Sequence, residues 1–240
     1  MSSPSPLYDD PVLAEAYARV TAHNVYNAAY ERPAVRALLG NVRGLDVLDA
    51  GCAAGEHAVW LQADGARLVA LDASETMVRI TRSRLDDSAR VLQADLAQPL
   101  PFAGASFDVV LSSLTLHYLE DWGPPLREFA RVLRPGGRLV ISTHHPFLLP
   151  MLQMIDDYDY HSVSLVEDAF DSFAAEPVPV RYYHRPLARI VADVLGAGFA
   201  LRGLHEPMPT AEADARNPAA AERLRKRPWF LVVDAESVRR

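Results

Sequence analysis

The stretch Asp46-Val47-Leu48-Asp49-Ala50-Gly51-Cys52-Ala53-Ala54-Gly55-Glu56-His57 decides the fold, because an apolar run there ends in an acid and then breaks into small residues. The apolar run suits a strand that is buried on both faces. Gly51 and Gly55 bracket a tight turn in which no side chain keeps a ligand from the backbone. A helix from about Glu56 to Ala63 follows and offers free N–H groups at its first turn. The stretch therefore predicts a strand, a ligand-binding turn and a helix.

The glycine spacing of this turn bears on the kind of ligand. The dinucleotide-binding pattern G-x-G-x-x-G would require glycine at positions 53 and 56, where the chain has Ala53 and Glu56. A glutamate there would crowd and repel a pyrophosphate. The spacing disfavours a dinucleotide, and it leaves open a structural turn with no ligand at all.

Two further apolar runs also end in an acid. Residues 67–72 end at Asp72, and residues 91–95 end at Asp95. A carboxylate at the end of the second strand can accept hydrogen bonds from both hydroxyls of a ribose, as an NAD site would also require. Asp95 can accept from the exocyclic amine of a base, or it can cap the turn that follows it. Three acids that each end a successive strand indicate one nucleoside-binding edge.

These motifs together resemble those of the class I S-adenosylmethionine-dependent methyltransferases, in particular small-molecule enzymes with a methyltransferase-11-like domain. Asp49 to Gly55 is similar to the family's first motif, with Ala53 in place of its middle glycine, and the sequence Leu-Arg-Pro-Gly-Gly-Arg-Leu at 133–139 is a further mark of the family. The resemblance covers about Val47 to Asp234. It implies S-adenosyl-L-methionine as cofactor and S-adenosyl-L-homocysteine as product. It also implies a set of cofactor-binding residues: Tyr26, Asp49, Gly51, Cys52, Ala53, Gly55, His57, Asp72, Ala73, Met77, Asp95, Leu96 and Ser112.

The expected fold class is α/β, with a Rossmann-like sheet of seven strands that is mostly parallel, has an antiparallel last strand and carries helices on both faces. Residues 1–40 are predicted to form a helical lid segment, and residues 41–240 the methyltransferase domain. The segment at about 146–185 shows no regular alternation and is rich in aromatic and acidic residues, among them Asp156, Asp157 and Tyr158. We interpret it as a substrate cap inserted after the fifth strand; a surface excursion or a dimer contact is the alternative.

Three histidines are predicted on the ligand edge of the sheet. His117 lies in the loop after the fourth strand, and His144 and His145 lie at the end of the fifth. Histidine titrates near neutral pH, so it can act as a general base toward a weakly acidic hydroxyl. We therefore predict that His144 or His145 is the base, with His117 as the next candidate. The alternative is that all three histidines have purely structural roles. Arg181 and Arg185 are candidates for recognising an acidic acceptor.

Composition narrows the partners. The formal net charge of -7 gives no attraction to phosphate backbones, so no nucleic acid is expected. Cys52 is the single cysteine and cannot form an intrachain disulfide. No targeting segment, membrane-spanning run or zinc spacing is recognised, so the protein is expected to be cytoplasmic, off the membrane and free of metal. A monomer or a homodimer is expected.

The predicted function is methyl transfer from S-adenosylmethionine to a small-molecule acceptor, which is an activity of the EC 2.1.1 type. A role in secondary metabolism is one option. Oxygen is the favoured acceptor atom, with carbon or nitrogen as options. Two alternatives come from other classes. One is an NAD(P)-dependent oxidoreductase on a Rossmann fold, and the other is a non-catalytic S-adenosylmethionine-binding module.

Overall fold

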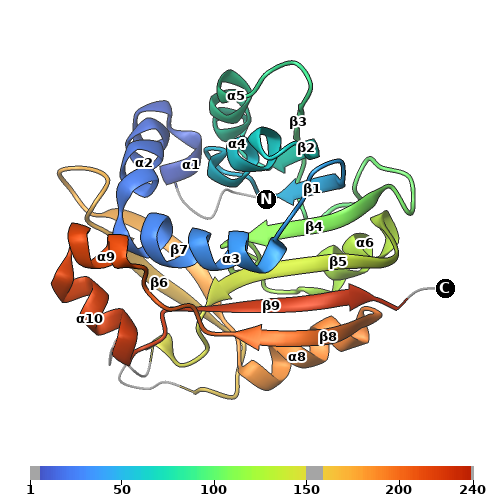
Figure 1. Ribbon diagram of the computed structural model, residues 1–240. Helices are drawn as coiled ribbons and strands as arrows, with labels where there is room; N and C mark the ends of the chain where they lie inside the picture. The colour runs from blue at the N-terminus through green and yellow to red at the C-terminus, as the bar shows by residue number, and fades with distance from the viewer. Residues whose placement is uncertain (1–5, 150–158, 239–240) are drawn as a thin grey trace.

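The computed structural model describes residues 6–149 and 159–238, and their centre is a seven-stranded sheet in the order β3-β2-β1-β4-β5-β9-β8 (Figure 1). Strands from β3 to β5 run parallel, and β9 runs antiparallel to both of its neighbours. The Rossmann-like sheet with an antiparallel last strand is therefore confirmed. The strands of this sheet are β1 (Asp46–Ala50), β2 (Arg67–Asp72), β3 (Arg90–Gln93), β4 (Phe107–Ser113), β5 (Leu133–His144), β8 (Phe199–His205) and β9 (Phe230–Ser237).

Helices cover both faces of the sheet, because its central strands are apolar on both sides. In β1, Val47 belongs to the core under α3, α4 and α5, whereas Leu48 belongs to the core under α6 and α8. This follows from the two-residue period of a strand. The helices are α1 (Pro6–Asp9), α2 (Pro11–His23), the π-helix η1 (Asn27–Glu31), α3 (Arg32–Leu39), α4 (Glu56–Ala63), α5 (Glu75–Arg84), the 3-10 helix η2 (Leu116–Tyr118), α6 (Gly123–Val132), α8 (Leu187–Gly196), α9 (Ala211–Arg216) and α10 (Pro218–Lys226). No helix of the described ranges is long and apolar enough to cross a bilayer.

Local signals place the elements that carry the site. The helix α4 has the predicted bounds, and the Ser74 side chain caps α5 by accepting a hydrogen bond from the Met77 N–H at 3.2 Å. The Arg-Pro-Gly-Gly sequence at 134–137 falls inside the bounds of β5. It still interrupts the ladder, since the register with β4 shifts between the pairs Phe107–Leu133 and Val109–Arg138.

The segment after β5 contains an antiparallel hairpin, β6 (Ser164–Phe170) and β7 (Val178–His184), which the sequence interpretation missed. Its alternation is visible in β7, where Val178 and Val180 are buried and Pro179 between them is exposed. The hairpin contacts η2 and α1. Asp156, Asp157 and Tyr158 lie outside the described residues, so the expected cap is described only in part.

The described part of the N-terminal segment is helical, and it is attached to the start of α5. Ser74 Oγ donates a hydrogen bond to the Tyr8 carbonyl at 2.6 Å, and Thr76 Oγ1 donates to the Asp9 carbonyl at 2.9 Å. Both α1 and α2 contact α5, which they flank in Figure 1. These contacts place α1 beside the end of β2.

Candidate active site

A cavity of about 580 Å³ lies at the carboxyl ends of the parallel strands, a size typical of small-molecule sites. Part of its lining comes from the end of β2 and from residues that follow β1, β2 and β3, and another part from the end of β4, η2 with its flanking residues and the β6–β7 hairpin. The helices α1 and α2 contribute three further residues. The lining residues are Tyr8, Asp9, Tyr17, Gly51, Ala53, Leu71, Asp72, Ala73, Ser74, Ala94, Asp95, Leu96, Ser113, Leu114, Thr115, Tyr118, Leu119, Leu165, Arg181 and Tyr183.

The Asp72 carboxylate is held in place by backbone N–H groups from two segments, the turn after β1 and the start of α5. Its Oδ2 accepts a hydrogen bond from the Ala53 N–H, and its Oδ1 accepts one from the Ser74 N–H, each at 2.9 Å. Burial raises the pKa of this carboxyl, and these two hydrogen bonds oppose that shift. Each carboxylate oxygen has two lone pairs, so the arrangement leaves acceptor capacity for the hydroxyls of a ribose.

The turn after β1 has a backbone that suits close approach of a ligand. Gly51 has a φ of 87°, and a Cβ at this position would meet Thr115 side-chain atoms at 2.3 Å. Thr115 Oγ1 donates to the Gly51 carbonyl at 3.2 Å, which ties the end of β4 to the turn. Ala53 also has a positive φ, 45°, which strains a residue with a side chain.

Asp49 lies beneath this turn and is 1% exposed. Its Oδ2 has no hydrogen-bond partner among the described residues. Burial raises the pKa of the carboxyl to about 6; His57 opposes the shift, and the charges of Asp72 and Glu31 add to it. An acid without a partner makes the turn favourable for a cationic ligand.

Asp95 has the capping role considered from the sequence and also reaches the cavity. Its Oδ1 accepts a hydrogen bond from the Ala97 N–H at 2.8 Å, so the carboxylate does cap the following turn. Asp95 also lines the cavity together with Leu96. The capping hydrogen bond fixes the carboxylate at the edge where the adenine is predicted to bind.

Of the predicted cofactor residues, the cavity lining includes Gly51, Ala53, Asp72, Ala73, Asp95 and Leu96. The other predicted cofactor residues are absent from the lining. Ser112 Oγ donates to the Ala50 carbonyl, the buried Cys52 thiol lies near Thr81, Gly55 precedes α4, and Met77 packs on Ala14. The structure thus places these residues under the turn and not at its surface.

The lid residues at the cavity differ from the one predicted. Tyr26 packs against Trp229, with ring centroids 4.9 Å apart, and is absent from the lining, which contains Tyr8 and Tyr17. The Tyr8 and Tyr118 hydroxyls are hydrogen-bonded to each other, and the Tyr8 ring meets the Tyr17 ring edge-on at 5.2 Å. Tyr8 and Tyr17 lie in the predicted lid segment, but neither is among the cofactor-binding residues predicted from the sequence.

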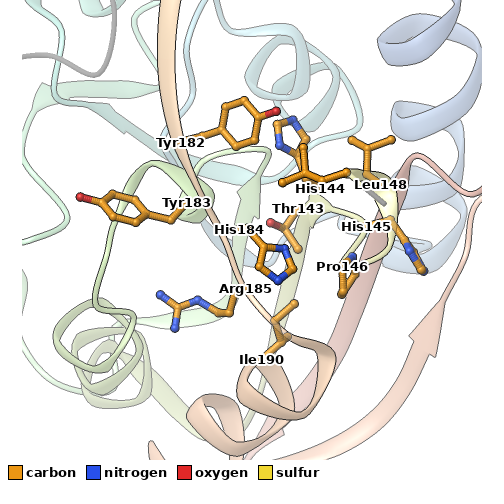
Figure 2. Close-up of a pocket in the computed structure, with 11 residues that line it drawn as sticks. Thr143, His144, His145, Pro146, Leu148, Tyr182, Tyr183, His184, Arg185 and Ile190 are labelled. Carbon is orange, nitrogen blue, oxygen red and sulfur yellow. The ribbon is translucent and has the colours of Figure 1, made fainter. Parts of the chain in front are cut away.

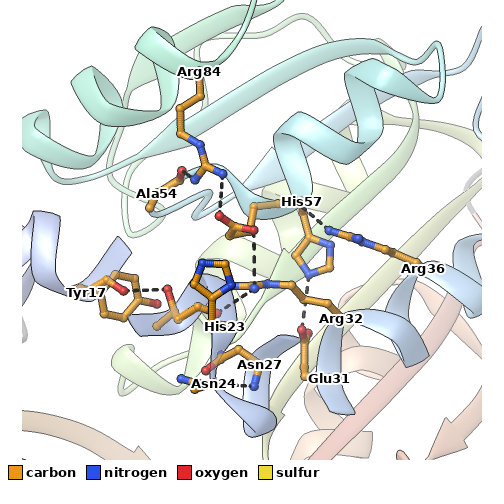
Figure 3. Close-up of polar contacts among 12 residues, drawn as sticks. Tyr17, His23, Asn24, Asn27, Glu31, Arg32, Arg36, Ala54, His57 and Arg84 are labelled. Atoms are coloured by element: carbon orange, nitrogen blue, oxygen red, sulfur yellow. Dashed lines mark hydrogen bonds and ion pairs between the residues drawn. The ribbon is translucent and has the colours of Figure 1, made fainter. Parts of the chain in front are cut away.

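A buried polar network joins the N-terminal segment to the turn. Glu31 Oε1 accepts hydrogen bonds from Ser113 Oγ at 2.8 Å and Ser142 Oγ at 2.5 Å. Figure 3 shows the Glu31 carboxylate pointing at the His57 ring, with 3.4 Å between Oε2 and Nε2. Burial alone would raise the pKa of Glu31, but His57 and the two serines bring it below its ordinary value. The network fixes Ser113, which lines the cavity, and His57, which belongs to α4.

Glu56 forms a second connection at the start of α4. Its carboxylate is 2.6 Å from the Arg84 guanidinium of α5 and 3.6 Å from that of Arg32 in α3. Arg36 also donates to the Glu56 carbonyl at 3.0 Å. Glu56, which the dinucleotide pattern would replace by glycine, therefore joins three helices around the turn.

The histidines predicted as bases do not line the 580 Å³ cavity. The rings of His117 and His144 stack with centroids 4.2 Å apart. The Tyr182 ring meets the His144 ring edge-on at 4.6 Å (Figure 2). Burial lowers the pKa of His144 to about 4 and that of His117 well below its ordinary value, with the charge of His144 adding to the second shift. Both imidazoles are therefore neutral at pH 7.

His145 has both ring nitrogens in use. Its Nδ1 accepts a hydrogen bond from the Phe147 N–H at 3.2 Å, so Nε2 carries the proton and lies 3.0 Å from Glu206 Oε1. Figure 2 shows the residue at a separate cavity of about 10 Å³, which has room for about one water molecule. This geometry suits a structural imidazole.

Comparison with known proteins agrees with this site. A family model described as a methyltransferase domain matches residues 48–141. The chain is 30% identical over 206 residues to a malonyl-[acyl-carrier protein] O-methyltransferase from Enterobacter lignolyticus, covering 83% of this chain and 81% of that protein. It is 38% identical over 152 residues to a demethylmenaquinone methyltransferase from Clavibacter sepedonicus, covering 62% and 61%.

Solved structures show the same architecture. An S-adenosylmethionine-dependent methyltransferase from Mesorhizobium loti superposes with a TM-score of 0.68 at 30% identity, covering 86% of this chain and 97% of that one. A second one from Aquifex aeolicus, at 16% identity, has a TM-score of 0.61 over 95% and 98% and supports the fold alone. The chain belongs to the class I S-adenosylmethionine-dependent methyltransferases, and its cofactor is S-adenosylmethionine.

Proposed function

We propose that this methyltransferase acts on an oxygen atom of a small-molecule acceptor that binds beside the cofactor in the 580 Å³ cavity. The observation that carries the proposal is that two groups of residues with different chemistry line the cavity. Asp72, Asp95 and the turn at Gly51 supply groups suited to the cofactor, whereas Tyr118 and the β6–β7 hairpin are lining residues to which the predicted cofactor contacts give no role. A site for two ligands is what a transfer reaction requires.

S-adenosylmethionine, when bound, supplies a methyl group already activated on a sulfonium sulfur. The chain's task is then to align the acceptor, and alignment alone can contribute several orders of magnitude to the rate. Asp72 would hold the ribose hydroxyls, and Asp95 with Leu96 the adenine. The Ser113 and Thr115 hydroxyls already donate to Glu31 and to the Gly51 carbonyl, whereas the Tyr8 and Tyr118 hydroxyls share one hydrogen bond. One of these two phenols therefore keeps a proton that it can donate to an acceptor oxygen.

The side chains near the acceptor favour an oxygen that ionises easily. Burial raises the pKa of Tyr17 to about 12 and the pKa values of Tyr8 and Tyr118 well above 10, so these phenols stay protonated at pH 7. No histidine lines the cavity among the described residues. A carboxylate or an acidic phenol needs no general base, and the name of the Enterobacter relative supports oxygen as the acceptor atom.

The test is transfer of a deuterated methyl group to a metabolite extract, with products identified by mass spectrometry. We expect a product that carries the added methyl group on oxygen. A methyl ester loses this group on alkaline hydrolysis, whereas a methyl ether keeps it. A methyl group found on carbon or nitrogen would refute the choice of oxygen. Cofactor binding without any transfer would favour the non-catalytic binding module.

The general base stays a prediction, and single-turnover rates test it. If His144 or His145 removes a proton, His144→Ala or His145→Ala should slow transfer by about 10²–10⁴-fold. The geometry favours the opposite result, a rate within a few-fold of the parent enzyme, because neither ring faces the cavity.

A further inference from the structure

The structure separates the two arginines that sequence analysis left as candidates for acceptor recognition. Arg185 is buried, its guanidinium lies 2.8 Å from the Asp193 carboxylate, and it stacks over the Trp122 ring at 4.8 Å. It holds the base of the hairpin to α8 and has no access to the cavity. Arg181 lies on β7, lines the cavity and has a side chain that is 65% exposed. Arg181 is therefore the arginine that a bound molecule can reach.

The charges of the cavity lining are distributed unevenly. The carboxylates of the lining are Asp9 in α1, Asp72 at the end of β2 and Asp95 in the loop after β3. Among the described residues of the lining, Arg181 is the one side chain with a permanent positive charge. The charged lining residues of α1 and near the ends of β2 and β3 are thus acidic, which suits a cationic cofactor, and the hairpin contributes the one guanidinium of the described lining. An anionic group of a ligand beside the hairpin could therefore pair with Arg181.

The present partner of Arg181 is readily displaced. Glu167 lies directly opposite Arg181 in the β6–β7 ladder, and its Oε1 is 2.8 Å from the Arg181 Nη2. The Glu167 side chain is 66% exposed, and an ion pair between two exposed side chains contributes little to stability. A guanidinium has five N–H donors, so it can bind a second anion in addition to Glu167 or in its place.

We propose that Arg181 anchors an anionic group of the acceptor, a carboxylate or a phosphate, and so selects anionic small molecules as substrates. The inference rests on the proposed function, because it assigns the hairpin part of the lining to the acceptor. Leu165 and Tyr183 are paired across the same hairpin and also line the cavity. They provide an apolar and an aromatic surface beside the guanidinium. The acceptor class is accordingly a small molecule with an apolar or aromatic body and an anionic end.

Equilibrium binding to the protein saturated with S-adenosylhomocysteine tests this inference without any need for turnover. The probes are two matched pairs, 4-hydroxybenzoate with 4-hydroxybenzamide and phenyl phosphate with phenol. We expect at least one anion to bind about tenfold more tightly than its neutral partner. The pair with the larger ratio identifies carboxylate or phosphate as the preferred group.

Variants assign the preference to Arg181. Arg181→Gln should remove the preference for the anion, whereas Arg189→Gln, an exposed arginine on α8 outside the lining, should keep it. Glu167→Gln should strengthen anion binding, because it removes the competing carboxylate. Equal binding of both members of each pair, or a preference that survives in Arg181→Gln, would overturn the inference. Failure to bind S-adenosylhomocysteine would instead count against the proposed function.

Discussion

Replacing Asp49 by asparagine should change the stability of the cofactor-free protein more favourably at neutral pH than in acid, each time relative to wild type. The same change should weaken cofactor binding. The side chain is 1% exposed and its Oδ2 lacks a partner among the described residues. Ionisation of this acid is therefore costly in the folded protein, and asparagine keeps the shape without the charge.

The magnitude follows from the pKa. Burial raises the pKa of Asp49 from 3.8 to about 6, and this gap corresponds to about 3 kcal/mol. Because the folded state binds the proton more tightly than the unfolded state, Asp49 favours folding below pH 4, and this contribution is lost as the pH rises through about 6. The free energy of unfolding of the Asp49→Asn variant, relative to wild type, should therefore rise by up to about 3 kcal/mol between pH 4 and pH 8.

Urea denaturation of both proteins across this pH range measures the difference, and Asp87→Asn, a change at an exposed acid, is the matched control. Calorimetry supplies the second readout. S-adenosylmethionine should bind wild type more tightly as the pH rises through 6, and at pH 8 it should bind the Asp49→Asn variant about tenfold more weakly. Parallel stability curves, or equal affinity at pH 8, would refute the reasoning.

Three further changes test the turn and the network beneath it. Gly51→Ala should lower the free energy of unfolding by about 1–3 kcal/mol in thermal denaturation, because its Cβ would meet Thr115 at 2.3 Å; an unchanged melting temperature would contradict this. Ala53→Gly should be neutral or stabilising by up to about 1 kcal/mol in the same assay, since it relieves a φ of 45°; a marked loss would show that the strain is absent. Glu31→Gln should cost about 1–3 kcal/mol in urea denaturation by unpairing Ser113, Ser142 or His57, and a cost no larger than that of Glu167→Gln on the exposed hairpin would argue against the network.

The parts of the site that sequence reasoning reached are those set by local chemistry. The strand, turn and helix around Gly51 follow from an apolar run, two glycines and a helical pattern within a dozen residues. The acids Asp72 and Asp95 could be placed because parallel strands bring their carboxyl ends to one edge. Each inference needed only neighbours along the chain and the rule for parallel sheets.

The parts that were missed depend on contacts between distant residues. The Tyr8–Tyr118 hydrogen bond joins positions 110 residues apart, and the sequence near Tyr8 contains no pattern that predicts it. Whether His145 faces a ligand or Glu206 depends on the path of the chain after β5. Arg181 and Arg185 differ by four positions, yet one lines the cavity and the other is buried against Trp122. Such orientations are decided by packing, which the pattern of residues does not encode by itself.

The most direct test of the central claim is the affinity of the Asp72→Ala variant for S-adenosylmethionine, measured by isothermal titration calorimetry. Asp72 is held by the Ala53 and Ser74 N–H groups at the cavity edge, so its loss should weaken binding by about 1.5–3 kcal/mol, or about 10–150-fold. Asp87→Ala, at an exposed site, should bind like wild type, and circular dichroism checks that both variants are folded. A folded Asp72→Ala protein with an unchanged dissociation constant would contradict the assignment of this cavity to the cofactor.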